Sequence, residues 1–136
     1  KIKGDSFIVT NCDTIIDVNI KNLIDFQKER KFDLTIVVNY KNYNLPYGEI
    51  DVDKSGSFIK IREKPNYKFL INSGLYLMNK KVISAVKKNK FLNMNDLISN
   101  ISKKKLKVGL YPITDNSWID VGQWSEYKKF KKKISY

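Results

Sequence analysis

The chain contains no histidine, so any chemistry it performs must use other side chains. This excludes histidine-based triads, histidine-ligated metal sites and the most common general base. The single cysteine, Cys12, has no histidine partner that could activate it as a nucleophile. Carboxylates, lysines, backbone amides and a hard divalent cation remain. Phosphoryl and nucleotidyl transfer use these groups, because positioning and charge neutralisation supply most of the catalysis in such reactions.

Two carboxylates stand out by their positions. Asp13 follows the apolar run 6–10, which is typical of a buried strand, and open α/β sheets bind ligands at the ends of such strands. Asp120 lies in the compact apolar segment 118–122, where a charge needs a partner. Two carboxylates from distant segments suit Mg²⁺, which proteins hold through one or two carboxylates plus substrate phosphates. The position of Asp13 is equally compatible with a residue that only turns the chain or caps a helix.

Polar residues and glycines interrupt the strands predicted in the middle of the chain. Glu63 and Lys64 follow one strand, where they could contact hydroxyls and a phosphate or simply form a surface ion pair. Asn72 and Gly74 lie inside an apolar strand, and a glycine there marks either close approach of a ligand or a β-bulge. Gly48 has the same two interpretations. Residue types alone leave both possibilities open at each position.

Hydrophobic periodicity predicts the elements that position these residues. Buried strands are expected over residues 6–10, 34–38, 69–78 and 107–113. Helices are expected from about residue 20, with Asp17 or Asn19 as the N-cap, and over 81–86, over 94–101 and from 123 onward. The first forty residues therefore predict a strand–helix–strand unit of a parallel sheet. Residues 47–61 alternate about a turn and predict a hairpin with one solvated face, and 118–122 predicts a compact turn.

Composition limits the class of protein. The 136 residues fit one domain or part of one, and a hydrophobic content of 42% is enough to form a core. No apolar run approaches the roughly 20 residues of a membrane span, and the first residues do not resemble a signal peptide, so we expect no membrane association. One cysteine cannot form an internal disulfide, so a cytoplasmic location is expected.

The net charge of +12 raises the alternative of a basic nucleic-acid-binding domain. Only Arg30 and Arg62 among the 26 basic residues are arginines, whereas phosphate and base recognition favour the bidentate guanidinium. The lysines are spread along the chain, and solvated lysines explain them more simply than a binding groove does. We therefore expect no nucleic-acid partner. A nucleic-acid-binding domain would require a contiguous positive face and steeply salt-dependent binding.

Taken in order, five segments resemble the sugar-phosphate nucleotidylyltransferases. They are FIVTNCD at 7–13, YGEI at 47–50, EKP at 63–65, INSGLY at 71–76 and WIDVG at 118–122. The resemblance runs from about residue 6 to residue 127, and it is greatest to bacterial hexose-1-phosphate guanylyltransferases of the mannose-1-phosphate type. It implies an α/β protein with a partial Rossmann-like nucleotidyltransferase fold, in which a mixed sheet carries flanking helices and a β-hairpin.

The resemblance also implies a reaction and its metal. Asp13 and Asp120 would be the catalytic residues that hold a Mg²⁺ ion bridging the nucleotide phosphates. A sugar-1-phosphate oxygen would attack the α-phosphorus of a nucleoside triphosphate, with GTP as the expected donor of GMP. The products would be a nucleotide sugar and pyrophosphate. A nucleophile that is already ionised at neutral pH needs no general base, which is consistent with the lack of histidine.

The same resemblance implies a binding site for the hexose-1-phosphate. Glu63 would bond to sugar hydroxyls and Lys64 to the sugar phosphate, while Asn72 and the backbone of Gly48 would line the sugar pocket. The full substrate-binding set implied is Asn11, Gly48, Glu63, Lys64, Asn72 and Gly74.

The family's glycine-rich phosphate loop is expected well before residue 6 and is not in this sequence. We therefore expect residues 1–136 to be the C-terminal portion of a single catalytic domain that is inactive alone. An exposed sheet edge would make it self-associate, for instance as a homo-oligomer. The sequence is also compatible with a noncatalytic regulatory relative that binds a nucleotide sugar. A glycosyltransferase is a weaker rival, since its Asp-x-Asp pattern occurs here only at 51–53, within a predicted hairpin strand.

Overall fold

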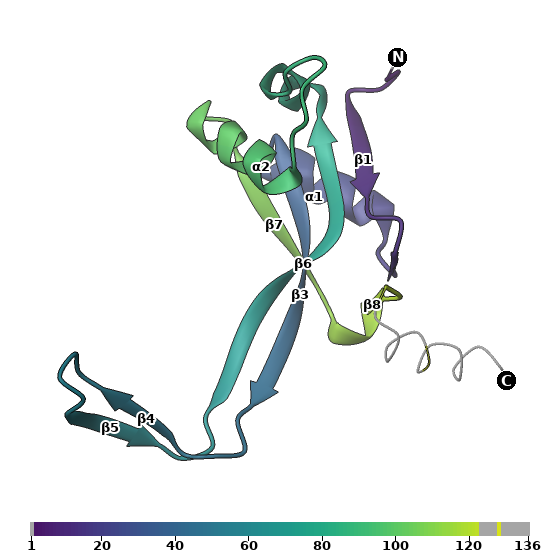
Figure 1. The fold of residues 1–136 in the computed structure, drawn as a ribbon. Coiled ribbons are helices and arrows are strands. Elements are labelled where there is room, and N and C mark those ends of the chain that lie inside the picture. Colours follow the sequence, from purple (N-terminus) through teal and green to yellow (C-terminus); the bar gives the residue numbers. More distant parts are fainter. Residues whose placement is uncertain (1, 123–127, 129–136) are drawn as a thin grey trace, which may run out of the picture.

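The computed structural model describes residues 2–122 and residue 128, and its centre is a four-stranded sheet of order β1-β6-β3-β7. Figure 1 shows this sheet between helices, with a long two-stranded arm extending from one end. The sheet strands are β1 (Ser6–Thr10), β3 (Leu34–Asn44), β6 (Asn66–Asn79) and β7 (Val108–Ile113). The predicted α/β fold with a mixed sheet, flanking helices and a hairpin is confirmed.

Helices and two small strand pairs complete the described chain. The helices are α1 (Ile20–Arg30), α2 (Met94–Lys103) and the 3₁₀ helices η1 (Lys80–Ala85) and η2 (Asp115–Ser117). The strand pairs are β2 (Thr14–Ile16) with β8 (Trp118–Asp120), and β4 (Glu49–Val52) with β5 (Phe58–Arg62). The helix expected from residue 123 lies outside the described residues. No helix in the described ranges has the length and apolarity needed to cross a membrane.

The order of the strands in the sheet does not follow their order in the sequence. β6 lies between β1 and β3 and runs antiparallel to both, whereas β3 and β7 are parallel neighbours. β1 and β3 therefore run in the same direction, as the strand–helix–strand pattern predicts, but they are not adjacent. The strand that separates them, β6, comes from residues much later in the chain, and it makes the sheet mixed.

Alternating residues of the sheet build a core on each face. Ile36, Val38 and Met78 face η1 and α2, where Ile101 is fully buried. The neighbouring positions face α1 and the β2–β8 pair; they include Val37, Leu75 and Leu77. The molecule therefore has three layers. Asn19 caps α1 by accepting a hydrogen bond from the Asn22 amide, which confirms one of the two predicted caps.

Beyond residue 39 the two central strands leave the sheet and continue as an arm. β3 and β6 stay paired from Tyr40 with Leu70 to Asn44 with Asn66, and the β4–β5 hairpin lies at the far end of this ribbon (Figure 1). The predicted hairpin strands are confirmed, but solvent reaches more than the one face that the alternation predicted, since the apolar side chains are exposed as well. Ile50 is 59% exposed and Phe58 is 65% exposed, because the hairpin projects away from both helix layers.

Ion pairs rather than a core join the two strands of the hairpin. Arg62 donates from Nε to Glu49 over 2.8 Å and from Nη2 to Asp51 over 3.0 Å. Tyr67 at the start of β6 also donates its hydroxyl to Glu49. The Arg62 guanidinium, followed by the Tyr67 hydroxyl, lowers the pKa of Glu49 from 4.5 to about 2.

Gly109 of β7 allows the ring of Phe32, which follows α1, to pack closely against the strand. A Cβ atom at this position would lie 2.2 Å from the Phe32 ring. We predict that Gly109→Ala lowers the free energy of unfolding by about 1–3 kcal/mol, because the ring and strand must separate. Urea denaturation followed by circular dichroism measures this. Gly4→Ala is the control, since a Cβ there meets its nearest atom at 3.4 Å, and an equal loss in both variants would contradict the packing argument.

The Glu49 carboxylate makes the hairpin sensitive to acid. Because its pKa is lowered from 4.5 to about 2, the Arg62 pair stabilises the hairpin fully above pH 4.5 and loses this contribution as the pH falls toward 2. An NMR titration of the Glu49 carboxyl should show a midpoint near 2, and Arg62→Gln should raise it. A midpoint near 4.5 in the unmodified chain would refute the pairing.

Candidate functional site

A short strand pair brings the two predicted metal-binding carboxylates together. After β1 the chain turns through residues 11–13 and forms β2, which pairs antiparallel with β8 so that Thr14 lies opposite Asp120. Next to this pair, the Val121 amide donates to the Asp13 carbonyl oxygen over 2.9 Å. β2 was not predicted, and the predicted compact turn at 118–122 is instead the strand β8 followed by a turn at 121–122.

The side chains of Asp13 and Asp120 converge on Gly122. A Cβ atom built on Gly122 would lie 3.1 Å from Oδ2 of Asp13 and 3.1 Å from Oδ1 of Asp120. The two carboxylate oxygens are therefore at most 6.2 Å apart, twice that distance. The Gly122 amide donates to Asp120 Oδ1 over 3.1 Å, which holds this carboxylate beside the glycine. Glycine leaves open the space in front of both oxygens that a larger residue would fill.

The donors at this position have the chemistry of a magnesium site. Both are hard carboxylate oxygens, which Mg²⁺ prefers, and they come from segments held by backbone pairing. Within residues 2–122 and 128, no group of three or more histidine, cysteine or acidic side chains could hold a metal ion. A six-coordinate ion bound by Asp13 and Asp120 would therefore need water or substrate oxygens as its other ligands, as is usual for Mg²⁺.

Three of the predicted substrate-binding residues contact one another at the turn that leads to Asp13. Gly74 has φ +84°, and a Cβ there would lie 2.7 Å from Nδ2 of Asn11. The Asn11 amide donates to the Gly74 carbonyl oxygen over 2.9 Å, and the Gly74 amide donates to Asn72 Oδ1 over 3.0 Å. The Asn72 side chain in turn donates to the Tyr76 hydroxyl over 2.6 Å. Gly74 is thus required both by its backbone conformation and by the close approach of Asn11.

Trp118 and Ser73 position β8, and sequence reasoning assigned neither a role. The Trp118 indole donates to the Ser73 carbonyl oxygen over 2.9 Å. The buried Ser73 hydroxyl donates to the Val37 carbonyl oxygen over 2.8 Å. Together these bonds fix β8, and with it Asp120, to the irregular part of the central sheet, where the β3–β6 register shifts. The signal in the sequence that could have pointed to this role is that Trp118 stands two residues before Asp120.

The remaining predicted substrate-binding residues form a separate group at the hairpin. A Cβ on Gly48 would lie 3.2 Å from Glu63 Oε2, and Lys64 Nζ lies 4.0 Å from Glu63 Oε1. Both charged side chains are exposed. Six residue steps along β6, from Asn72 to Asn66, separate this group from Asn72, a length of about 20 Å along a strand. The structure thus divides the predicted set in two, because β3 and β6 remain paired along the whole arm.

Comparison with known proteins shows the family of the chain. A sequence model of the nucleotidyl transferase family matches residues 1–135. Mannose-1-phosphate guanylyltransferase 1 of Arabidopsis thaliana is 27% identical over 128 residues, covering 91% of this chain and 35% of that protein. The UTP–glucose-1-phosphate uridylyltransferase of Synechocystis is 26% identical over 132 residues, covering 90% of this chain and 33% of that protein. The chain spans about a third of the length of these curated relatives.

Solved structures share its fold. The crystal structure of HddC from Yersinia pseudotuberculosis superimposes with a TM-score of 0.66 at 28% identity, covering 98% of this chain and 57% of that one. The same protein complexed with GMP-PN gives a TM-score of 0.65 at 25% identity, with the same coverage. These neighbours have the Rossmann-like fold that the sequence predicted. With a family match over nearly its whole length, the chain belongs to the nucleotidyl transferase family.

Proposed function

We propose that this chain carries the metal- and sugar-binding part of an enzyme that transfers GMP from GTP to a hexose-1-phosphate and releases pyrophosphate. The convergence of Asp13 and Asp120 on Gly122, in a chain of this family, carries the proposal. Relatives named mannose-1-phosphate guanylyltransferase and a neighbour complexed with GMP-PN favour guanine as the base. The uridylyltransferase relative makes UTP the alternative donor.

Asp13 and Asp120 would hold Mg²⁺ in this enzyme, since their oxygens face a common open space at Gly122. When bound, the ion supplies charge neutralisation at the nucleotide phosphates. The chain itself contributes fixed carboxylates: the β2–β8 pairing sets the separation of their backbones, and the Trp118–Ser73 bond holds β8 against the sheet. Such preorganisation matters because nucleotidyl transfer depends chiefly on position and charge.

The proposed hexose-1-phosphate site has two parts. Asn11, Asn72 and Gly74 contact one another at the turn that leads to Asp13, whereas Glu63 and Lys64 lie on the arm. Glu63 would accept hydrogen bonds from sugar hydroxyls and Lys64 would bind the sugar phosphate. For both parts to contact one hexose phosphate, the β3–β6 ribbon has to bend toward the sheet. The β3–β6 register shifts between residues 36 and 38, in the buried sheet just before the ribbon begins.

Three further features remain predictions. The chain is proposed to be the C-terminal portion of one catalytic domain, to act in the cytoplasm, and to associate into a homo-oligomer. The rival proposal of a noncatalytic relative differs in a measurable way, because such a protein would bind a nucleotide sugar without forming one.

We predict that Asp13→Asn and Asp120→Asn each weaken Mn²⁺ or Mg²⁺ binding to the chain by about 10-fold or more, because each removes one charged oxygen ligand. Isothermal titration calorimetry measures the dissociation constant. Asp25→Asn is the matched control, since that carboxylate lies on α1 and pairs with Lys21. Equal affinities for all three variants and the unmodified chain would exclude the proposed metal site.

The 136-residue chain alone should show no measurable pyrophosphate release from GTP and a hexose-1-phosphate. Its six glycines are all separated from one another, so it lacks the glycine-rich loop that would stabilise charge on the transferred phosphate. The longer protein should release pyrophosphate and should lose this activity when Asp120 becomes Asn. Efficient turnover by the 136 residues would show that the missing loop is not required.

A further inference from the structure

The positive charge of the chain is concentrated on one layer of the molecule. Residues 80–107 contain nine lysines and one acidic residue, Asp96, and so carry +8 of the net charge of +12. They form η1, α2 and the connecting loops, which cover the sheet face opposite α1. Lysines occur along the whole chain, but in this segment few acidic residues balance them. Positive charge concentrated on one face produces a positive potential that attracts anions.

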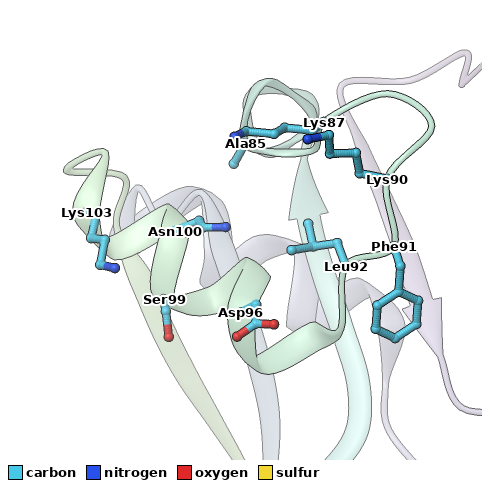
Figure 2. Close-up of a pocket in the computed structure, with 9 residues that line it drawn as sticks. All are labelled: Ala85, Lys87, Lys90, Phe91, Leu92, Asp96, Ser99, Asn100 and Lys103. Atoms are coloured by element: carbon cyan, nitrogen blue, oxygen red, sulfur yellow. The ribbon is translucent and has the colours of Figure 1, made fainter.

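A cavity of about 310 Å³ lies within this layer, between α2 and the loop that precedes it (Figure 2). Lys87 and Lys90 extend from the loop along one side, and Lys103 and Asn100 project from α2 (Figure 2). The volume is at the lower end of the range of small-molecule sites and fits a ligand of mononucleotide size.

Two hydrogen bonds fix the surroundings of this cavity, one from Lys104 and one from Asn93 to the acidic residue in the lining. Lys104 donates from Nζ to the Ser84 carbonyl oxygen over 2.7 Å, which ties α2 to η1. Asp96 accepts a 2.6 Å hydrogen bond from the Asn93 side chain, which caps α2. The lining therefore contains three lysines and one carboxylate that is already hydrogen-bonded, a balance that attracts anions.

Phe91 gives the cavity an aromatic surface. Its side chain lies at the edge of the cavity, on the loop that carries Lys90, and is 94% exposed, the highest exposure among the large apolar residues of the described chain. An exposed ring next to lysines offers a face on which a nucleobase can stack, while the ammonium groups bind phosphates. A simple phosphate would use the lysines but would leave the ring uncovered.

We propose that this cavity is a second binding site, which takes a nucleotide. Its phosphates would bind Lys87, Lys90 and Lys103, and its base would stack on Phe91. The site is distinct from the carboxylate pair, because β2 and β8 pack on the α1 side of the sheet and the cavity lies on the α2 side. Since all its charged anchors are lysines, binding requires no divalent cation. The inference does not depend on the proposed transferase activity.

Calorimetric titration of the chain with GTP in the presence of EDTA tests this proposal. A variant carrying Lys87→Gln, Lys90→Gln and Lys103→Gln should bind GTP about 10-fold or more weakly, because charge-assisted contacts to phosphate are lost. The matched control carries Lys21→Gln, Lys28→Gln and Lys54→Gln, which changes the net charge equally at exposed positions elsewhere. Its affinity should change by less than about 2-fold.

Two variants of Phe91 separate the contribution of stacking from that of charge. Phe91→Ala should weaken GTP binding but leave pyrophosphate binding unchanged, and Phe91→Tyr should restore GTP binding. Because GTP binding is measured in EDTA, it does not involve the metal ion that Asp13 and Asp120 would hold, so failure of the proposed transferase and failure of this site are distinguishable. Thermal melting followed by circular dichroism confirms that each variant is folded.

Three results would overturn the proposal. One is an equal loss of GTP affinity in the two lysine variants. Another is a GTP affinity that is the same in Phe91→Ala and in the unmodified chain. The third is tighter binding of a 20-nucleotide single-stranded nucleic acid than of GTP, together with an equal loss of that affinity in two variants. One is the cavity variant and the other carries Lys80→Gln, Lys81→Gln and Lys105→Gln. That outcome would identify an extended nucleic-acid face instead.

Discussion

The pairing of β2 with β8 is the constraint on which the candidate active site depends. Each strand has three residues, yet together they place the backbone of Asp13 beside that of Val121 and the carboxylates of Asp13 and Asp120 around Gly122. So short a pair has little stability alone. It is supported by Ile16 and Trp118, which pack against the α1-side core, and by the indole hydrogen bond to Ser73. Packing of the sheet thus fixes the geometry of the proposed metal ligands.

The two faces of the sheet have opposite chemistry. The α1 side carries the carboxylate pair, whereas the α2 side carries most of the net positive charge. This separation allows the protein to present oxygen ligands and cationic anchors without neutralising one with the other. The arm adds a third region, whose hairpin is held by Arg62 and Glu49 rather than by a core.

Much of the central sheet could be predicted from the sequence because buried strands are apolar and long enough to show a pattern. The strands at 6–10 and 108–113 and the α1 helix with its Asn19 cap are examples. Three-residue β2 is too short for periodicity to reveal. The placement of β6 between β1 and β3 depends on pairing between distant segments, which no local pattern encodes.

The candidate site was predictable in part for the same reasons. Asp13 and Asp120 could be selected by type and position, but only strand pairing shows that they approach Gly122. Glu63 and Lys64 could be selected as well, yet their separation from Asn72 follows from the continuous β3–β6 ribbon. The lysine-rich layer could have been found by counting charge within segments, since residues 80–107 are contiguous.

Paramagnetic broadening of backbone amide resonances by Mn²⁺ tests the central claim most directly. An ion held between the two carboxylates should selectively broaden the amides of Gly122, Val121 and Asp13 in the NMR spectrum, and Asp120→Asn should remove the effect. Broadening centred on the Glu49 and Asp51 carboxylates of the hairpin, or none near Gly122, would contradict a cation site between the β1–β2 turn and the end of β8.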